Sequence, residues 1–264
     1  LNTGHIQSVA RVQADAKDPG KNGNLPAPEV LTFDSYSPLL AGERGQMVGG
    51  YNVMPDNTFY GCCACIGSAG IGMLPKAAIL HSANGVVVNL YFAGRMSAGT
   101  PQRQRLTLHT DTSYPYGDGS IAMTLSLEQP EVFTLSLRVP AWSRKTMLTL
   151  NGEELPVEGT GYQSFRREWK DGDRLVLALD MRVQAVCPPE GSCNEDDFCA
   201  YRRGPVMLGA DARLGKDLED AFAVVYDSER IVGAAASAAC PEIPEAKLCV
   251  ALPVKEGGAF RLIY

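Results

Sequence analysis

The stretch Gly85-Val-Val-Val-Asn-Leu-Tyr-Phe-Ala93 decides the fold, because the hydrophobic period of the chain changes there. Before it, residues 66–81 carry apolar side chains at helical spacing. From Gly85 onward the residues are β-branched and aromatic, and the period becomes two. The sequence therefore predicts that a helical segment gives way to β-structure at this point.

The residues that follow predict strands at short spacing. Apolar and polar side chains alternate over residues 103–109, 120–127, 133–139, 146–150, 162–169 and 174–183. Asn151-Gly152 and Asp171-Gly172-Asp173 separate the last three of these segments with residues typical of tight turns. Roughly seven strands in roughly 100 residues, joined by turns, are typical of an antiparallel sandwich. We expect a mainly β protein of antiparallel β-sandwich domains, preceded by a short helical segment.

A domain boundary is expected near Cys187 to Asp197, which is rich in proline, glycine and acidic residues. Beyond it, residues 198–208, 221–226, 248–254 and 259–264 again resemble strands. We therefore divide the chain into a helical segment at residues 1–84, a β-sandwich at 85–184 and a second, incomplete β-sandwich at 185–264.

Composition excludes two classes of partner. The formal net charge of −6 argues against a nucleic-acid surface, which is normally basic. No run approaches the ~18 apolar residues of a membrane span, and no segment has the pattern of a signal peptide.

Adjacent cysteines favour a reducing compartment, so we expect a cytoplasmic protein. The sequence does not indicate an oligomeric state.

The helical segment is expected to cover residues 66–81. Pro75 should kink it or begin a new helix. The stretch His81-Ser-Ala-Asn-Gly85 should end it, with glycine at the C-terminus.

Three cysteines precede this helix, in Phe59-Tyr-Gly-Cys-Cys-Ala-Cys-Ile-Gly67. Cys62 and Cys63 are adjacent and cannot easily bond each other, but they can offer two thiolates to one zinc ion. The positive end of a helix lowers the pKa of a nearby cysteine, which then acts as a ligand, a nucleophile or both. The alternatives are an inert, buried set of thiols and a thiol-redox or metal-sensing module that includes Cys65.

Two further sets of residues allow alternatives. Cys187, Cys193 and Cys199 are spaced too widely for a usual zinc knuckle, so a second metal site there is a minor alternative. Trp142 and Trp169 could stack on sugar rings in a non-catalytic carbohydrate-binding or structural sandwich, although packing at a sandwich edge is the favoured interpretation.

Several of these stretches together resemble a known family. They are Phe59 to Cys63 with the helix after it, Gly85 to Tyr91, Leu137-Arg-Val-Pro-Ala-Trp-Ser143, and Arg203-Gly-Pro-Val206. In order and spacing they resemble glycoside hydrolase family 127, which is known for β-L-arabinofuranosidases.

The resemblance implies a catalytic (α/α)6 barrel followed by two β-sandwiches, with this chain supplying the end of the barrel and the sandwiches. It also implies a carbohydrate substrate. Cys62 would be both the nucleophile of a retaining hydrolase and a zinc ligand, and Cys63 would be a second zinc ligand. Cys65 receives no role from the resemblance.

The sequence departs from the family pattern in one respect. The family completes its zinc site with a Glu-x-Cys motif upstream of the paired cysteines, and its acid/base glutamate lies upstream as well. Before Cys62 this sequence contains no cysteine, and its glutamates there are Glu29 and Glu43, neither in such a motif. We therefore expect an incomplete zinc site and no hydrolysis by these 264 residues alone.

Overall fold

A computed structural model describes residues 52–53, 59–60, 62–187, 199–214, 223–233, 235–244, 246–255 and 257–264. At 52–53, 59–60, 62–68 and 212 it describes the backbone alone. The chain divides into two units, Leu1–Leu74 and Pro75–Tyr264. In the first unit, β1 (Asn52–Val53) pairs with β2 (Phe59–Tyr60).

Helix α2 (Cys62–Ala78) begins four residues earlier than expected and contains Pro75 in its interior. The expectation that it continues to His81 and ends at Gly85 is wrong. Residues after Ala78 instead form β3 (Ile79–Ser82), which pairs with β4 (Gly85–Val88) as an antiparallel hairpin. The apolar spacing of residues 79–81 suits a helix and a short strand equally well, and pairing with the β-branched β4 decides for the strand.

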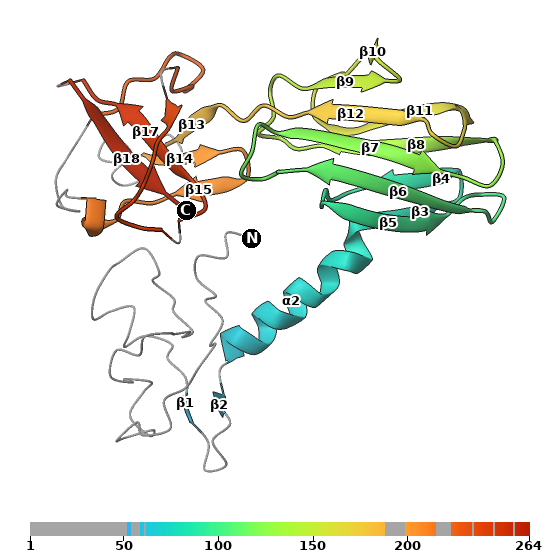
Figure 1. Ribbon diagram of the computed structural model, residues 1–264, viewed down its shortest axis with the longest axis horizontal. Coiled ribbons are helices and arrows are strands. Elements are labelled where there is room, and N and C mark those ends of the chain that lie inside the picture. Colours follow the sequence, from blue (N-terminus) through green and yellow to red (C-terminus); the bar gives the residue numbers. More distant parts are fainter. Residues whose placement is uncertain are drawn as a thin grey trace. The chain divides into compact units, whose positions relative to one another are not determined.

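The predicted sandwich is confirmed, and its two sheets are seen in Figure 1. The first sheet contains six strands in the order β10-β9-β12-β7-β6-β5. Their bounds are β5 Gly94–Gly99, β6 Arg105–Thr112, β7 Ser120–Ser126, β9 Met147–Leu150, β10 Glu153–Leu155 and β12 Arg174–Ala178. The second sheet has the order β11-β8-β4-β3, with β8 at Glu131–Val139 and β11 at Gly161–Trp169.

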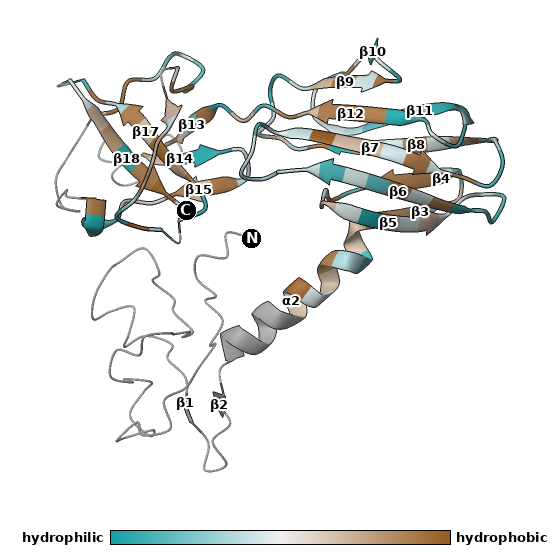
Figure 2. Ribbon diagram, viewed as in Figure 1, coloured by the Kyte–Doolittle hydropathy of each residue, from teal (hydrophilic) through white to brown (hydrophobic). Residues whose placement is uncertain are grey.

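The alternation of the sequence explains which face of each strand is buried. Along β6, Leu106 and Leu108 are fully buried, whereas His109 is exposed, and the brown and teal segments of Figure 2 follow this alternation. The core between the sheets includes the largest fully buried side chains, namely Trp169, Phe133, Leu106, Leu108, Ile121, Met123, Leu125, Leu135, Leu137, Leu148, Leu175 and Leu177.

One pairing departs from the antiparallel pattern. Strand β4 lies parallel to β8, with Gly85 opposite Thr134 and Val88 opposite Leu137. Strands β5, β6 and β7, which come between them in sequence, belong to the other sheet. The backbone at Gly85 approaches that of Thr134 so closely that a Cβ atom on Gly85 would overlap the Thr134 carbonyl.

A smaller β unit follows. One sheet has the order β13-β14-β15, with bounds Val183–Val186, Ala200–Arg203 and Val206–Leu208. Another has the order β16-β17-β18, with bounds Ala236–Ser237, Cys249–Pro253 and Ala259–Ile263. The 3-10 helix η2 covers Ala212–Leu214. The strand expected at 221–226 is reduced, among its described residues, to a bridge between Val224 and Val254.

Within the described residues, no helix combines the length and the apolar character that crossing a membrane requires.

Candidate functional site

The predicted nucleophile lies in the first turn of a helix. Cys62 is the first residue of α2, and Cys63 and Cys65 follow in the same turn. No acidic residue occupies that turn, so its free backbone N–H groups leave a positive electrostatic potential there. The side chains of these three cysteines lie outside what the structure describes, so their roles remain predictions.

The donor set can be compared with what zinc requires. Structural and catalytic zinc sites use three or four protein ligands in tetrahedral geometry. Cys62 and Cys63 supply two soft donors from neighbouring positions. Among the residues with described side chains, no group of three or more histidine, cysteine or acidic residues is arranged to hold a metal. Two donors fall short of the three or four that a zinc site uses, so a zinc site formed by Cys62 and Cys63 with further ligands remains a prediction.

The other end of α2 is fixed by Asn89. Its backbone N–H donates to the carbonyl of Ala78 (2.9 Å), and its side-chain amide donates to the carbonyl of Ala77 (3.0 Å). These bonds satisfy carbonyls that a helix C-terminus leaves free. The Arg138 guanidinium donates to the Asn89 carbonyl (2.6 Å), and the Tyr162 hydroxyl donates to its side-chain oxygen (2.7 Å). The arginine of the Leu137–Ser143 motif thus holds the segment that ends the helix.

The second half of that motif meets the Arg203-Gly-Pro-Val206 motif. The amide of Gln184 donates to the Trp142 carbonyl (2.8 Å), and the Trp142 ring lies 3.4 Å from where a Cβ on Gly204 would stand. Gly204 has a φ of 58°, a region that favours glycine. Arg203 donates to the carbonyl of Gly117 (2.7 Å). Both motifs therefore join the larger sandwich to the smaller β unit, which is a structural role.

Neither tryptophan is a free platform for a sugar. Trp169 is fully buried, donates from its indole N–H to the Phe133 carbonyl (3.1 Å), and carries Arg167 over its ring. Trp142 is half-buried and stacks against Tyr114 with ring centroids 6.5 Å apart. Both tryptophans therefore pack within the protein as the favoured interpretation expects, although Trp169 lies in the core between the sheets rather than at a sandwich edge.

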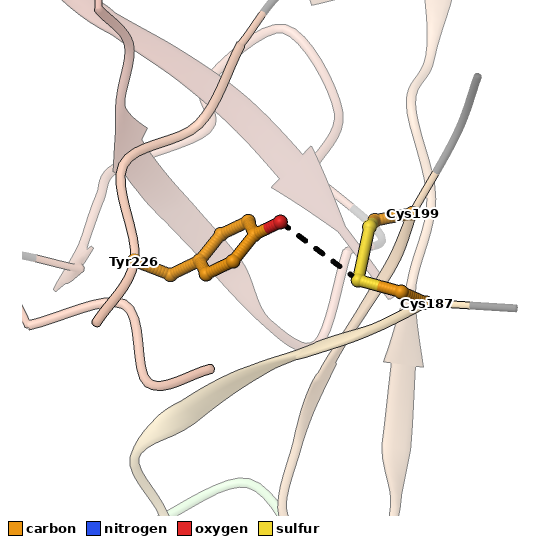
Figure 3. The surroundings of a disulfide bond; sticks show 3 residues. All are labelled: Cys187, Cys199 and Tyr226. Carbon is orange, nitrogen blue, oxygen red and sulfur yellow. Dashed lines mark hydrogen bonds between the residues drawn. A yellow bond between two sulfur atoms is a disulfide. The ribbon is translucent and has the colours of Figure 1, made fainter. Parts of the chain in front are cut away.

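Two of the later cysteines form a pair that their sequence spacing does not indicate. Cys187 and Cys199 form a disulfide, and the Tyr226 hydroxyl lies 3.9 Å from the Cys187 sulfur (Figure 3). A metal site that uses these two thiols is therefore excluded while the bond is intact, and Cys193 lies outside the described residues. The spacing of the three cysteines alone does not reveal this pair. Cys187 directly follows β13 and Cys199 directly precedes β14, and these two strands are hydrogen-bonded neighbours.

A hollow lies on the outer face of the six-stranded sheet. Its volume is about 450 Å³, and it is lined by Gly94, Arg95, His109, Thr110, Asp111, Ala122, Thr124 and Arg174. None of these residues stands out in the sequence. Most occupy outward positions or ends of their strands, whereas Thr110 is buried on the inward side of β6, and only the strand order brings them together.

The sequence of the larger sandwich matches one family model. Residues 85–181 match the model described as "Beta-L-arabinofuranosidase, GH127 middle domain". The predicted resemblance to glycoside hydrolase family 127 is thereby confirmed over this part of the chain. No curated protein sequence matches the chain.

Solved structures share the fold. The GH127 β-L-arabinofuranosidase Ara127N-Se from Geobacillus stearothermophilus T6 is 22% identical, with a TM-score of 0.62, over 77% of this chain and 34% of that structure. A GH127 β-arabinofuranosidase is 19% identical, with a TM-score of 0.57, over 77% and 35%. A glycoside hydrolase is 22% identical, with a TM-score of 0.53, over 70% and 34%. The chain thus spans about a third of each structure's length.

Proposed function

Because residues 85–181 carry the middle domain of glycoside hydrolase family 127, we propose that this chain is part of a retaining glycoside hydrolase. Its substrates would be β-L-arabinofuranosides or related glycosides. The family match carries this proposal. The placement of Cys62 and Cys63 in the first turn of α2, ahead of the matched domain, supports it.

The proposed chemistry uses Cys62 as the nucleophile. A zinc ion bound by Cys62 and Cys63, together with ligands from elsewhere, would supply the positive charge that keeps both thiols ionised at neutral pH. The Cys62 thiolate attacks the anomeric carbon, a carbon–sulfur bond forms, and the glycosidic carbon–oxygen bond breaks. A carboxylic acid protonates the leaving oxygen and then activates the water that releases the sugar.

The acid/base is not assigned to a residue of this chain. The family pattern places it in a segment for which this sequence has no match, and the zinc site lacks two donors here. We therefore propose that the 264 residues alone do not turn over substrate. Turnover of an aryl β-L-arabinofuranoside by the isolated chain would contradict this.

The test uses the complete gene product that contains this chain. Cys62→Ser should abolish hydrolysis of the aryl β-L-arabinofuranoside, because a serine hydroxyl is neither ionised nor a good zinc ligand at neutral pH. Cys65→Ser is the matched control in the same turn and should retain turnover. Metal analysis of both variants should show less zinc in the Cys62 variant. Full activity of Cys62→Ser would refute the proposal.

A cytoplasmic location is a further proposal and rests on the adjacent thiols alone. The Cys187–Cys199 disulfide favours the opposite, an oxidising compartment. Measuring the mass of the protein isolated from its native source, with free thiols blocked before lysis, distinguishes the two, because only a disulfide leaves that pair unblocked.

A further inference from the structure

The hollow on the six-stranded sheet is built from two rows of residues. In one row Arg95 lies opposite His109, His109 opposite Thr124, and Thr124 opposite Arg174, so four strands contribute one side chain each. In the next row Asp111 lies opposite Ala122. All of these residues are at outward positions of their strands, because the buried residues of β6, β7 and β12 alternate with them.

The sizes of the side chains explain the hollow. Arg95 and Arg174 stand at the two ends of the row, three strand spacings apart, or about 14 Å at about 4.8 Å per strand. Between them stand His109 and the short Thr124, and the short Ala122 lies in the next row. Gly94 leaves its edge of the hollow without a side chain. The two arginines thus form the walls and the short residues the floor of an open hollow with a volume of about 450 Å³.

The two arginines of the hollow have no partner among the residues that the structure describes. The Arg95 and Arg174 guanidiniums make no hydrogen bond or ion pair within the described part of the chain. By contrast, Arg182 pairs with Asp180 (2.7 Å) and Arg261 with Glu242 (2.8 Å). Asp111 is the one acidic residue among those that line the hollow. Two unpartnered cations therefore face the same open space in a chain whose net charge is −6.

We propose that this hollow binds an acidic oligosaccharide, one that carries the carboxylates of uronic acid residues. The choice of a carbohydrate rests on the proposed function. Guanidinium groups recognise carboxylates by paired, charge-assisted hydrogen bonds. The Thr124 hydroxyl, the His109 ring and the Asp111 carboxyl supply donors and acceptors for sugar hydroxyls.

The lining also distinguishes this ligand from simpler ones. A volume of about 450 Å³ lies within the roughly 300–1,000 Å³ range of sites for multi-ring small molecules, so it exceeds what a single inorganic anion needs. No aromatic side chain lines the hollow, so a neutral sugar would lack a stacking surface. The recognition assigned here is therefore ionic and hydrogen-bonded.

The test measures binding by calorimetry with the full 264-residue chain. The probes are a galacturonic acid trimer, a neutral arabinose trimer and inorganic phosphate. We expect the acidic trimer to bind, the neutral trimer to bind at least tenfold more weakly, and added salt to weaken binding because the site is open to solvent. Comparable binding of the neutral trimer, equal binding of phosphate, or no binding of the acidic trimer would each overturn the proposal.

Variants test the location. Arg95→Ala combined with Arg174→Ala should weaken binding of the acidic trimer at least tenfold, and Ala122→Gln, which fills the floor without changing the charge, should weaken it as well. Arg166→Ala is the matched control, because Arg166 is an exposed arginine on β11 of the other sheet. An equal loss with Arg166→Ala, or no loss with the double variant, would overturn the proposal. Circular dichroism should show that each variant is folded.

This result can be separated from the proposed hydrolase activity. In the complete gene product, the double arginine variant should hydrolyse a small neutral aryl arabinofuranoside at the unchanged rate. Failure of Cys62→Ser to abolish hydrolysis would refute the proposed chemistry and leave the binding result standing. Loss of aryl arabinofuranoside hydrolysis in the double arginine variant would instead contradict a binding site separate from the chemistry.

Discussion

Glu131 is a buried acidic residue whose replacement tests how the larger sandwich is held together. Its side chain is 2% exposed and accepts three hydrogen bonds. They come from the Thr100 hydroxyl (2.6 Å), the Gln102 backbone N–H (3.0 Å) and the Gln104 side-chain amide (2.9 Å). One carboxyl group at the start of β8 thus fixes the whole turn between β5 and β6.

The expected cost of Glu131→Ala follows from these contacts. A typical hydrogen bond contributes about 1 kcal/mol net, so three bonds contribute about 3 kcal/mol. The Thr100 hydroxyl is 1% exposed and cannot find water in place of the carboxyl, whereas Gln102 and Gln104 are closer to solvent. We therefore expect the free energy of unfolding to fall by about 3 kcal/mol.

Urea unfolding measures this change. With a slope of about 1–3 kcal/mol per molar urea, the midpoint should fall by about 1–3 M. Glu128→Ala is the matched control, because Glu128 is exposed, and surface changes of this kind stay within about 0.5 kcal/mol. Glu131→Gln keeps one acceptor oxygen and should fall between the two. A midpoint for Glu131→Ala no lower than that of the Glu128 variant would refute the reasoning.

Three other predictions concern stability. Gly85→Ala should destabilise the sandwich severely, because the new methyl group overlaps backbone of β8, and weak amide-exchange protection of β4 would show this; native-like protection would contradict it. Replacing Cys187 and Cys199 by alanine should cost about 3 kcal/mol, the value expected for a loop of this length, in chemical unfolding of the smaller β unit; an unchanged midpoint would contradict it. Burial opposes ionisation of Asp180, but hydrogen bonds from Arg182 prevail and hold the pKa of that carboxyl below its usual value. The ion pair is therefore fully stabilising above about pH 4 and lost as pH falls through the lowered pKa, so Asp180→Asn should flatten the acid limb of a stability–pH curve; an unchanged limb would contradict this.

The sequence predicted the larger sandwich because alternation carries that information locally. The predicted segments at 133–139 and 162–169 correspond closely to β8 and β11. Strand β5, Gly94–Gly99, was missed, since its two terminal glycines and small side chains give no β-branched signal. The hairpin at 79–88 was partly misassigned because only its partner strand distinguishes Ile79–Ser82 from the end of a helix.

The candidate functional residues divide in the same way. Cys62 and Cys63 stand out because adjacent cysteines are chemically conspicuous in any sequence, and their role remains a prediction. Arg95 and Arg174 are ordinary exposed arginines, separated by most of the larger sandwich in sequence. They become neighbours of one hollow only through the order β12-β7-β6-β5, which no local pattern encodes.

The parallel pairing of β4 with β8 has a consequence for how the protein is made. About 50 residues separate Gly85 from its partner Thr134, so at about 5–20 residues per second a ribosome needs about 2–10 s to deliver the second strand after the first. During that interval the Val86–Val88 edge has no partner, and such apolar edges favour self-association of nascent chains. Chaperone capture, or its absence, at this stage of translation should therefore influence the yield of folded protein.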